Sequence, residues 1–231
     1  EIYVHRESGQ KLSSGDARNL NRAYPGAKNG NLTEQIAYGI VELINHYDIN
    51  ITIDLHEASP EYLTNNAIVH MDSDEARNVA ASAYIELEIQ DIRISVESSP
   101  ASLRGLTHRE LGDVTNTMAF LLETSNASQG RLRGAFTKEL IVTGQDKFYK
   151  KAEELGLLFA PPVHINERVG RHTATISAIV NGYNKLMDQN GRRDGLTQDE
   201  IKELQFSLSN IPTYNEVLTN GVGNYLLEVK K

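Results

Sequence analysis

Two ionisable side chains in this sequence follow runs that have the pattern of β-strands. In the first run, residues 49–55 alternate apolar and polar side chains with a period of two, and His56 comes next. Ligands in open α/β sheets sit at the carboxyl ends of strands. An imidazole at that edge, with the Asp54 carboxylate two residues behind it on the same face, suits a metal ligand or a catalytic base. An ordinary strand-end histidine is the alternative.

Glu123 follows the second run. Residues 117–122 are nearly all apolar, which is typical of a strand buried on both faces. A carboxylate placed directly after such a run is costly to bury unless it has a partner or a chemical role. The sequence therefore makes Glu123 a candidate acid–base residue, with a structural partner as the alternative.

A third candidate group lies in a loop near the start of the chain. The first 30 residues are rich in turn signals, and they surround a basic, amide-rich segment that includes Asn21 and Arg22. So many turns around such side chains are consistent with a functional loop. A surface connection without a chemical role is the alternative.

These candidates need elements that hold them in place. We expect helices at residues 31–47, 74–90, 137–155, 165–187 and 197–209, and strands at residues 49–55, 67–71, 92–96, 117–122 and 225–229. Residues 104–113 are expected to be irregular. Strands that alternate with helices of this length predict an α/β fold, with helices on both faces of the sheet. One domain is expected over residues 1–187, with residues 188–231 as a C-terminal extension packed on it.

Composition excludes several classes of function. The net charge of −8, from 23 Lys and Arg against 31 Asp and Glu, argues against nucleic acid or an anionic membrane as a partner. The absence of cysteine excludes disulfides, thiolate nucleophiles and Cys-based metal sites. No apolar run approaches the ~18 residues that a membrane span needs. The chain does not begin with Met, so we expect the natural protein to start earlier.

A second possible metal pair occurs further along the chain. His164 and Glu167 have the His-x-x-Glu spacing that zinc sites use. The pair follows two prolines and opens a predicted helix, so a helix cap with solvated side chains is the favoured interpretation.

In their order along the chain, the candidate stretches resemble the zinc carboxypeptidase family, most closely its aspartoacylase and succinylglutamate desuccinylase-like branch. The matching motifs are NLNRAYPG at 19–26, ITIDLHEA at 51–58 and FLLETS at 120–125, with GLTHRELGD at 105–113 between the last two. The resemblance covers roughly residues 16–185. It implies a single α/β domain with a mixed, mostly parallel central sheet.

The resemblance also implies a role for each candidate residue. Family members hold one Zn²⁺ ion with a His-x-x-Glu pair and a later histidine, which His56 matches. Asn21 and Arg22 match the residues that grip the substrate's carboxylate, and Glu123 matches the general base that later acts as an acid. Zinc lowers the pKa of bound water to about 7, and the glutamate can move its proton to the leaving nitrogen. The implied function is hydrolysis of an amide bond next to a free carboxylate, in an acyl-amino acid or a peptide.

One family feature has no match in this sequence. The His-x-x-Glu pair of the family precedes the Asn-Arg motif, whereas His5 is followed here by Arg6, Glu7 and Ser8. Either the pair lies outside this chain, or this chain does not bind zinc in the usual way. The alternative function is therefore a non-catalytic domain that binds a carboxylate or a peptide and has lost its metal site.

Overall fold

The chain divides into two compact units. The computed structural model describes residues 2–189, 199–200 and 210–225. The first unit comprises Glu1–Asp54, Ile68–Arg77 and Glu97–Leu121, and the second comprises Leu55–Ala67, Asn78–Val96 and the described part of Leu122–Lys231. Each unit is described separately below.

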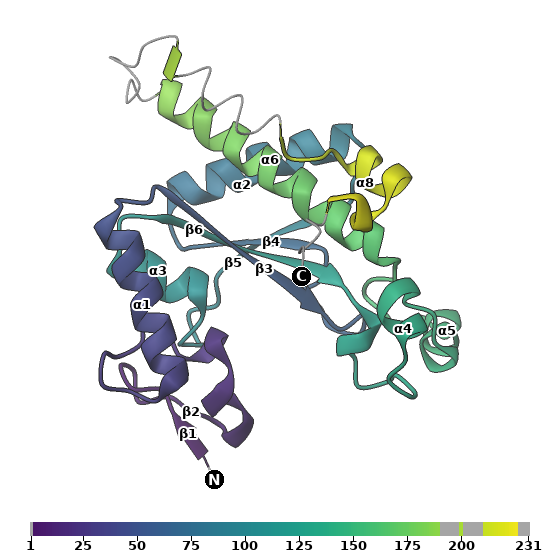
Figure 1. Ribbon diagram of the computed structural model, residues 1–231, viewed down its shortest axis with the longest axis horizontal. Coiled ribbons are helices and arrows are strands. Elements are labelled where there is room, and N and C mark those ends of the chain that lie inside the picture. Colours follow the sequence, from purple (N-terminus) through teal and green to yellow (C-terminus); the bar gives the residue numbers. More distant parts are fainter. Residues whose placement is uncertain (1, 190–198, 201–209, 226–231) are drawn as a thin grey trace, which may run out of the picture. The chain divides into compact units, whose positions relative to one another are not determined.

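The described residues contain a mixed sheet of four strands, flanked by helices (Figure 1), in the order β3-β6-β4-β5. The strands are β3 (Ile51–Ala58), β4 (Ala67–His70), β5 (Ser95–Ser98) and β6 (Met118–Ser125). The N–H of Met118 donates to the carbonyl of Asn50, and that of Asn126 donates to the carbonyl of Ala58. Residue numbers therefore rise together along β3 and β6, so these two strands are parallel. The predicted α/β class and mixed sheet are confirmed.

The first unit packs two helices around a small apolar core. Its elements outside the sheet are β1 (Ile2–Val4), β2 (Lys11–Ser13), η1 (Ser14–Arg18), η2 (Leu20–Arg22), α1 (Leu32–His46) and α3 (Thr107–Val114). Strands β1 and β2 pair in an antiparallel hairpin. The helix α1 begins at a capping box in which Asn31 and Glu34 satisfy each other's backbone N–H groups. Val41 of α1 and Leu111 of α3 belong to the same core as Ala119 of β6.

The second unit is built along one long helix. Besides most of α2 (Asp74–Ile89), it contains η3 (Ala127–Gln129), α4 (Lys138–Thr143), α5 (Lys147–Glu154), α6 (Ile165–Gln189), α8 (Tyr214–Asn220) and η4 (Val222–Tyr225). Figure 1 shows α6 crossing α2 and lying beside α8. At the α2 crossing, a Cβ added to Gly182 would lie 3.0 Å from the carbonyl oxygen of Val79, so the glycine permits close approach. No helix of the described residues, including the 25-residue α6, is long and apolar enough to cross a membrane.

Several predicted boundaries are wrong. Residues 104–113 were expected to be irregular, but Thr107–Val114 forms the helix α3. The single helix expected at residues 137–155 is two helices, because Gly144 adopts a left-handed φ of 73° and ends α4. Strand β5 begins at Ser95 rather than at residue 92. The helix expected at 197–209 and the strand expected at 225–229 lie almost entirely outside the described residues.

Candidate active site

His56 and Glu123 lie beside each other on neighbouring strands of the second unit. The same step in residue number separates Asn50 from Met118 and Ala58 from Asn126, so the register is constant along β3 and β6. In a pair of parallel strands, the backbone of one residue forms hydrogen bonds to two residues of the neighbouring strand. Its cross-strand neighbour is the residue between those two. This register makes Glu123 the cross-strand neighbour of His56. The sequence placed Glu123 just beyond the end of its strand, but β6 continues to Ser125.

Both side chains point to the face of the sheet opposite α6. Glu57 and Thr124, the next residue of each strand, contact side chains of α6. Because successive side chains of a strand point to opposite faces, His56 and Glu123 project from the other face. Both are partly buried, and the Glu123 Oε2 atom is shielded from solvent. An imidazole and a carboxylate thus share one face near the carboxyl ends of two parallel strands.

An ion pair between a buried arginine and a partly buried glutamate fixes the end of β3 on the α6 side. Arg168 of α6 is 2% exposed, and its Nε atom donates to the Glu57 Oε1 atom at 2.6 Å. Its two Nη atoms donate to the carbonyls of Val163 and Ile141, at 2.9 and 2.8 Å. The other Glu57 oxygen accepts from Asn126 at 2.6 Å. Because both charges have partners, this cluster is structural, and it orients the strand that carries His56.

His172 of α6 is kept neutral near this cluster. Burial lowers its pKa to about 4, while the Glu57 carboxylate opposes that shift. Its Nε2 atom lies 3.3 Å from the Thr124 hydroxyl. At neutral pH the imidazole is therefore uncharged and acts as a packing and hydrogen-bonding group behind β6.

Asn21 caps a helix in the first unit. Its Oδ1 atom accepts a hydrogen bond from the backbone N–H of Thr107, at 2.7 Å, where α3 begins. The Thr107 hydroxyl donates to the Asp54 carboxylate at 2.6 Å, so Thr107 connects Asn21 to Asp54. With Oδ1 used in the cap, the Asn21 Nδ2 group is the end left to donate to a ligand. Burial first, and then the Asp54 charge, raise the pKa of the neighbouring Tyr24 to about 12.

The loop that carries Arg22 is tightly packed. Gly105 has a φ of 82°, and an added Cβ would lie 2.4 Å from the Arg22 carbonyl oxygen. Gly26 shows the same φ and would place a Cβ 2.2 Å from the backbone nitrogen of Tyr38. The Arg22 side chain is 23% exposed, with Nε 3.7 Å from the Asp16 carboxylate and Nη1 donating to the Asn21 carbonyl at 2.6 Å. Its remaining N–H groups keep it capable of binding an anion.

The described residues do not complete a zinc site. His56 offers one imidazole, but no group of three His, Cys, Asp or Glu side chains among residues 2–189, 199–200 and 210–225 is placed to hold a metal ion. At the second candidate pair, the His164 Nδ1 atom accepts from the N–H of Asn166, and Glu167 pairs with Arg171 at 2.8 Å. These contacts agree with the predicted helix cap.

The four predicted site residues form two pairs, one in each unit. His56 and Glu123 belong to the second unit, and Asn21 and Arg22 to the first. No protein family, curated protein or solved structure matches the chain. The resemblance to zinc carboxypeptidases therefore stays a prediction from the motifs.

Sequence reasoning missed Thr107 as the residue that orders the Asn21 side chain. Thr107 lies inside the GLTHRELGD stretch, and its position just before a Glu-containing amphipathic segment is a usable helix-start signal. It also missed Arg168, which pairs with Glu57 from 111 positions away. No local sequence signal predicts that ion pair.

Proposed function

We propose that this chain is part of a hydrolase that cleaves an amide bond next to a free carboxylate. The observation that supports the proposal best is the pairing of His56 with Glu123 on one face, near the carboxyl ends of parallel strands. Such edges are where ligands bind in α/β sheets. The motif resemblance supplies the reaction class, because all four candidate residues match positions of the family's site.

In the proposed reaction, Glu123 handles the proton. Its carboxylate takes a proton from the attacking water as the new C–O bond forms, and it returns that proton to nitrogen as the C–N bond breaks. Asn21 and Arg22 are the proposed donors to the substrate's free carboxylate, through the Asn21 amide nitrogen and the Arg22 guanidinium.

His56 is the residue that we propose as a zinc ligand. The imidazole is one ligand of the expected set, and the other ligands are proposed to come from outside the described residues. Metal analysis of the purified protein tests this assignment. About one zinc per chain is expected in the wild type and clearly less in His56→Ala. Equal zinc contents in the two proteins would remove His56 from the metal site.

A non-catalytic carboxylate-binding domain is the second candidate. Its support is that His56 is the one expected zinc ligand found among the described residues, while Asn21 and Arg22 retain donors for an anion. This candidate predicts saturable binding of N-acyl amino acids without hydrolysis, even with added zinc. Turnover of any bound amide would reject it.

A further inference from the structure

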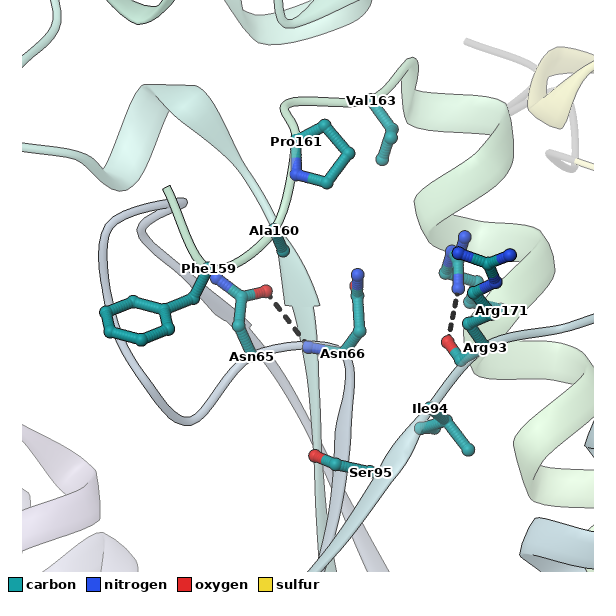
Figure 2. A pocket seen from close by; sticks show the side chains of 10 residues that line it. All are labelled: Asn65, Asn66, Arg93, Ile94, Ser95, Phe159, Ala160, Pro161, Val163 and Arg171. Carbon is teal, nitrogen blue, oxygen red and sulfur yellow. Dashed lines mark hydrogen bonds between the residues drawn. The ribbon is translucent and has the colours of Figure 1, made fainter. Parts of the chain in front are cut away.

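A pocket of about 470 Å³ lies in the second unit, and none of the residues that line it is a predicted site residue. It is formed where β4 and β5 begin, beside the segment that leads into α6 and one face of that helix (Figure 2). The volume is in the range of sites that enclose small molecules. Ten residues line it, among them two arginines and two asparagines but no carboxylate.

Arg171 presents a fixed and incompletely satisfied guanidinium to this pocket. One Nη atom donates to the Arg93 carbonyl at 2.6 Å, and the other donates to Glu167 at 2.8 Å. These two bonds fix the plane of the group, whose side chain is 14% exposed. The Nε atom is buried and has no hydrogen-bond partner. A buried N–H without an acceptor is unfavourable, so an acceptor supplied by a ligand would stabilise it.

Asn66 offers a second donor. Its backbone has a φ of 44°, a left-handed conformation that asparagine tolerates better than most residues. Its Oδ1 atom accepts a hydrogen bond from the N–H of Ser125 at 3.1 Å, which fixes the orientation of the carboxamide. The Nδ2 group at the other end of the carboxamide can then donate to a ligand. Figure 2 shows this side chain standing between Phe159 and Arg171. The Nδ2 group donates to no described residue.

Arg93 adds a second charge, and Phe159 adds an apolar wall. The Arg93 guanidinium forms no hydrogen bond or ion pair with the described residues. Phe159 is 64% exposed although it lines the pocket, and Pro161 and Val163 continue the apolar side. The lining thus combines donors that lack acceptors with an open aromatic ring.

We propose that this pocket binds a small molecule that carries an oxyanion, a carboxylate or a phosphate, on an apolar or aromatic body. Arginine and amide donors match the oxygen atoms of such a group. Glu167 pairs with Arg171, but no carboxylate lines the pocket, so the charge of Arg93 has no counter-charge among the lining residues. The apolar part of the ligand would cover Phe159. The site is separate from the proposed carboxylate grip of Asn21 and Arg22.

Calorimetric titration of the 231-residue chain tests the proposal. The probes are 3-phenylpropionate, phenyl phosphate and the neutral 3-phenylpropanamide. Saturable binding of at least one anion is expected, about tenfold or more tighter than the amide, because hydrogen bonds to a charged group are stronger. The tighter of the two anions identifies a carboxylate or a phosphate as the natural group. Lack of saturable binding by both anions would overturn the proposal.

Variants assign the binding to this pocket rather than to Asn21 and Arg22. Asn66→Asp keeps the shape, the tolerated φ and the acceptor for Ser125, but replaces the donor with a negative charge. Anion affinity should fall about tenfold or more in Asn66→Asp and in Arg93→Gln. It should stay within about twofold in Arg133→Gln, which changes an exposed arginine of the same unit.

A second pair of variants tests the apolar wall. Phe159→Ala should weaken binding of 3-phenylpropionate several-fold, because the ligand loses its aromatic contact. Phe148→Ala is the matched control, since Phe148 is also an exposed phenylalanine, at 50%, outside the pocket. Anion binding that is unchanged in both Asn66→Asp and Arg93→Gln would place the ligand elsewhere and overturn the proposal.

Discussion

His56 is the cross-strand neighbour of Glu123, and both side chains project from the face of the sheet opposite α6. The register of β3 and β6 produces this pairing. The contacts of Glu57 and Thr124 with α6 show from which face of the sheet the two side chains project. An imidazole and a partly buried carboxylate side by side form a basic unit of acid–base or metal-assisted chemistry. The proposed hydrolase function depends on this relationship.

Replacement of Asn21 separates its structural role from its proposed binding role. Asn21→Ala removes the acceptor at the start of α3, and we expect a loss of about 1 kcal/mol in the free energy of unfolding. Asn31→Ala removes the cap of α1 and should cost a similar amount. Only Asn21→Ala should raise KM, or the Kd for a carboxylate ligand, by about tenfold. Equal binding by the two variants would contradict the substrate-grip assignment.

Gly105 should be far less tolerant of a side chain than Gly9. Both glycines have a left-handed φ, of 82° and 68°, but an added Cβ meets the Arg22 carbonyl only at Gly105. Gly9→Ala should cost about 1 kcal/mol from the backbone conformation alone. Gly105→Ala should cost about 1–3 kcal/mol more, because the Arg22 loop must move. Urea denaturation measures both values, and equal losses would contradict the tight packing of this loop.

The neutral state of His172 should make stability depend on pH. The folded protein holds its pKa near 4, against about 6.5 in the unfolded chain. Between these values the unfolded state binds more protons, so the free energy of unfolding decreases as pH falls from 6.5 to 4 and does not change from this source above 6.5. The loss should reach a few kcal/mol.

Two histidine variants isolate this effect. His172→Gln should flatten the decrease between pH 6.5 and pH 4, whereas His46→Gln, at an exposed position of α1, should leave it intact. Thermal unfolding over this pH range is the measurement. An unchanged slope in His172→Gln would show that this imidazole is not buried in its neutral form.

Loss of Arg168 should destabilise the second unit strongly. Arg168→Met leaves the Glu57 carboxylate without its cation and two carbonyls without donors, and we expect a cost of about 3 kcal/mol. Arg6 also pairs with a glutamate, but its side chain is 53% exposed. Arg6→Met should cost much less than Arg168→Met, because solvent screens the charge of an exposed arginine. Similar costs for the two variants would contradict the structural role of the buried Arg168 side chain.

Elements with local signals were predictable from the sequence. The helix expected at residues 31–47 is α1, Leu32–His46, because its capping box and apolar periodicity both lie within the segment. The strand that carries His56 was also expected, although it continues to Ala58. Alternating β-branched residues predict such a strand from the local sequence alone.

Features set by distant residues were not predictable. The cap of α3 was missed because the acceptor for the N–H of Thr107 comes from Asn21, 86 positions earlier. The same holds for the pairing of His56 with Glu123, which depends on strand register rather than on either local sequence. Motif order identified the candidate residues, but only the paired strands show which two of them share a face.

Hydrolysis by the Glu123→Gln variant tests the central claim most directly. The assay compares the protein encoded by the full gene, in the wild-type form and as Glu123→Gln, on N-acyl amino acids and short peptides with added zinc. The exposed variant Glu153→Gln serves as the matched control. We expect kcat to fall at least about 100-fold in Glu123→Gln, with an unchanged melting temperature, and to stay near wild type in Glu153→Gln. Wild-type turnover by a folded Glu123→Gln protein would contradict the proposed mechanism.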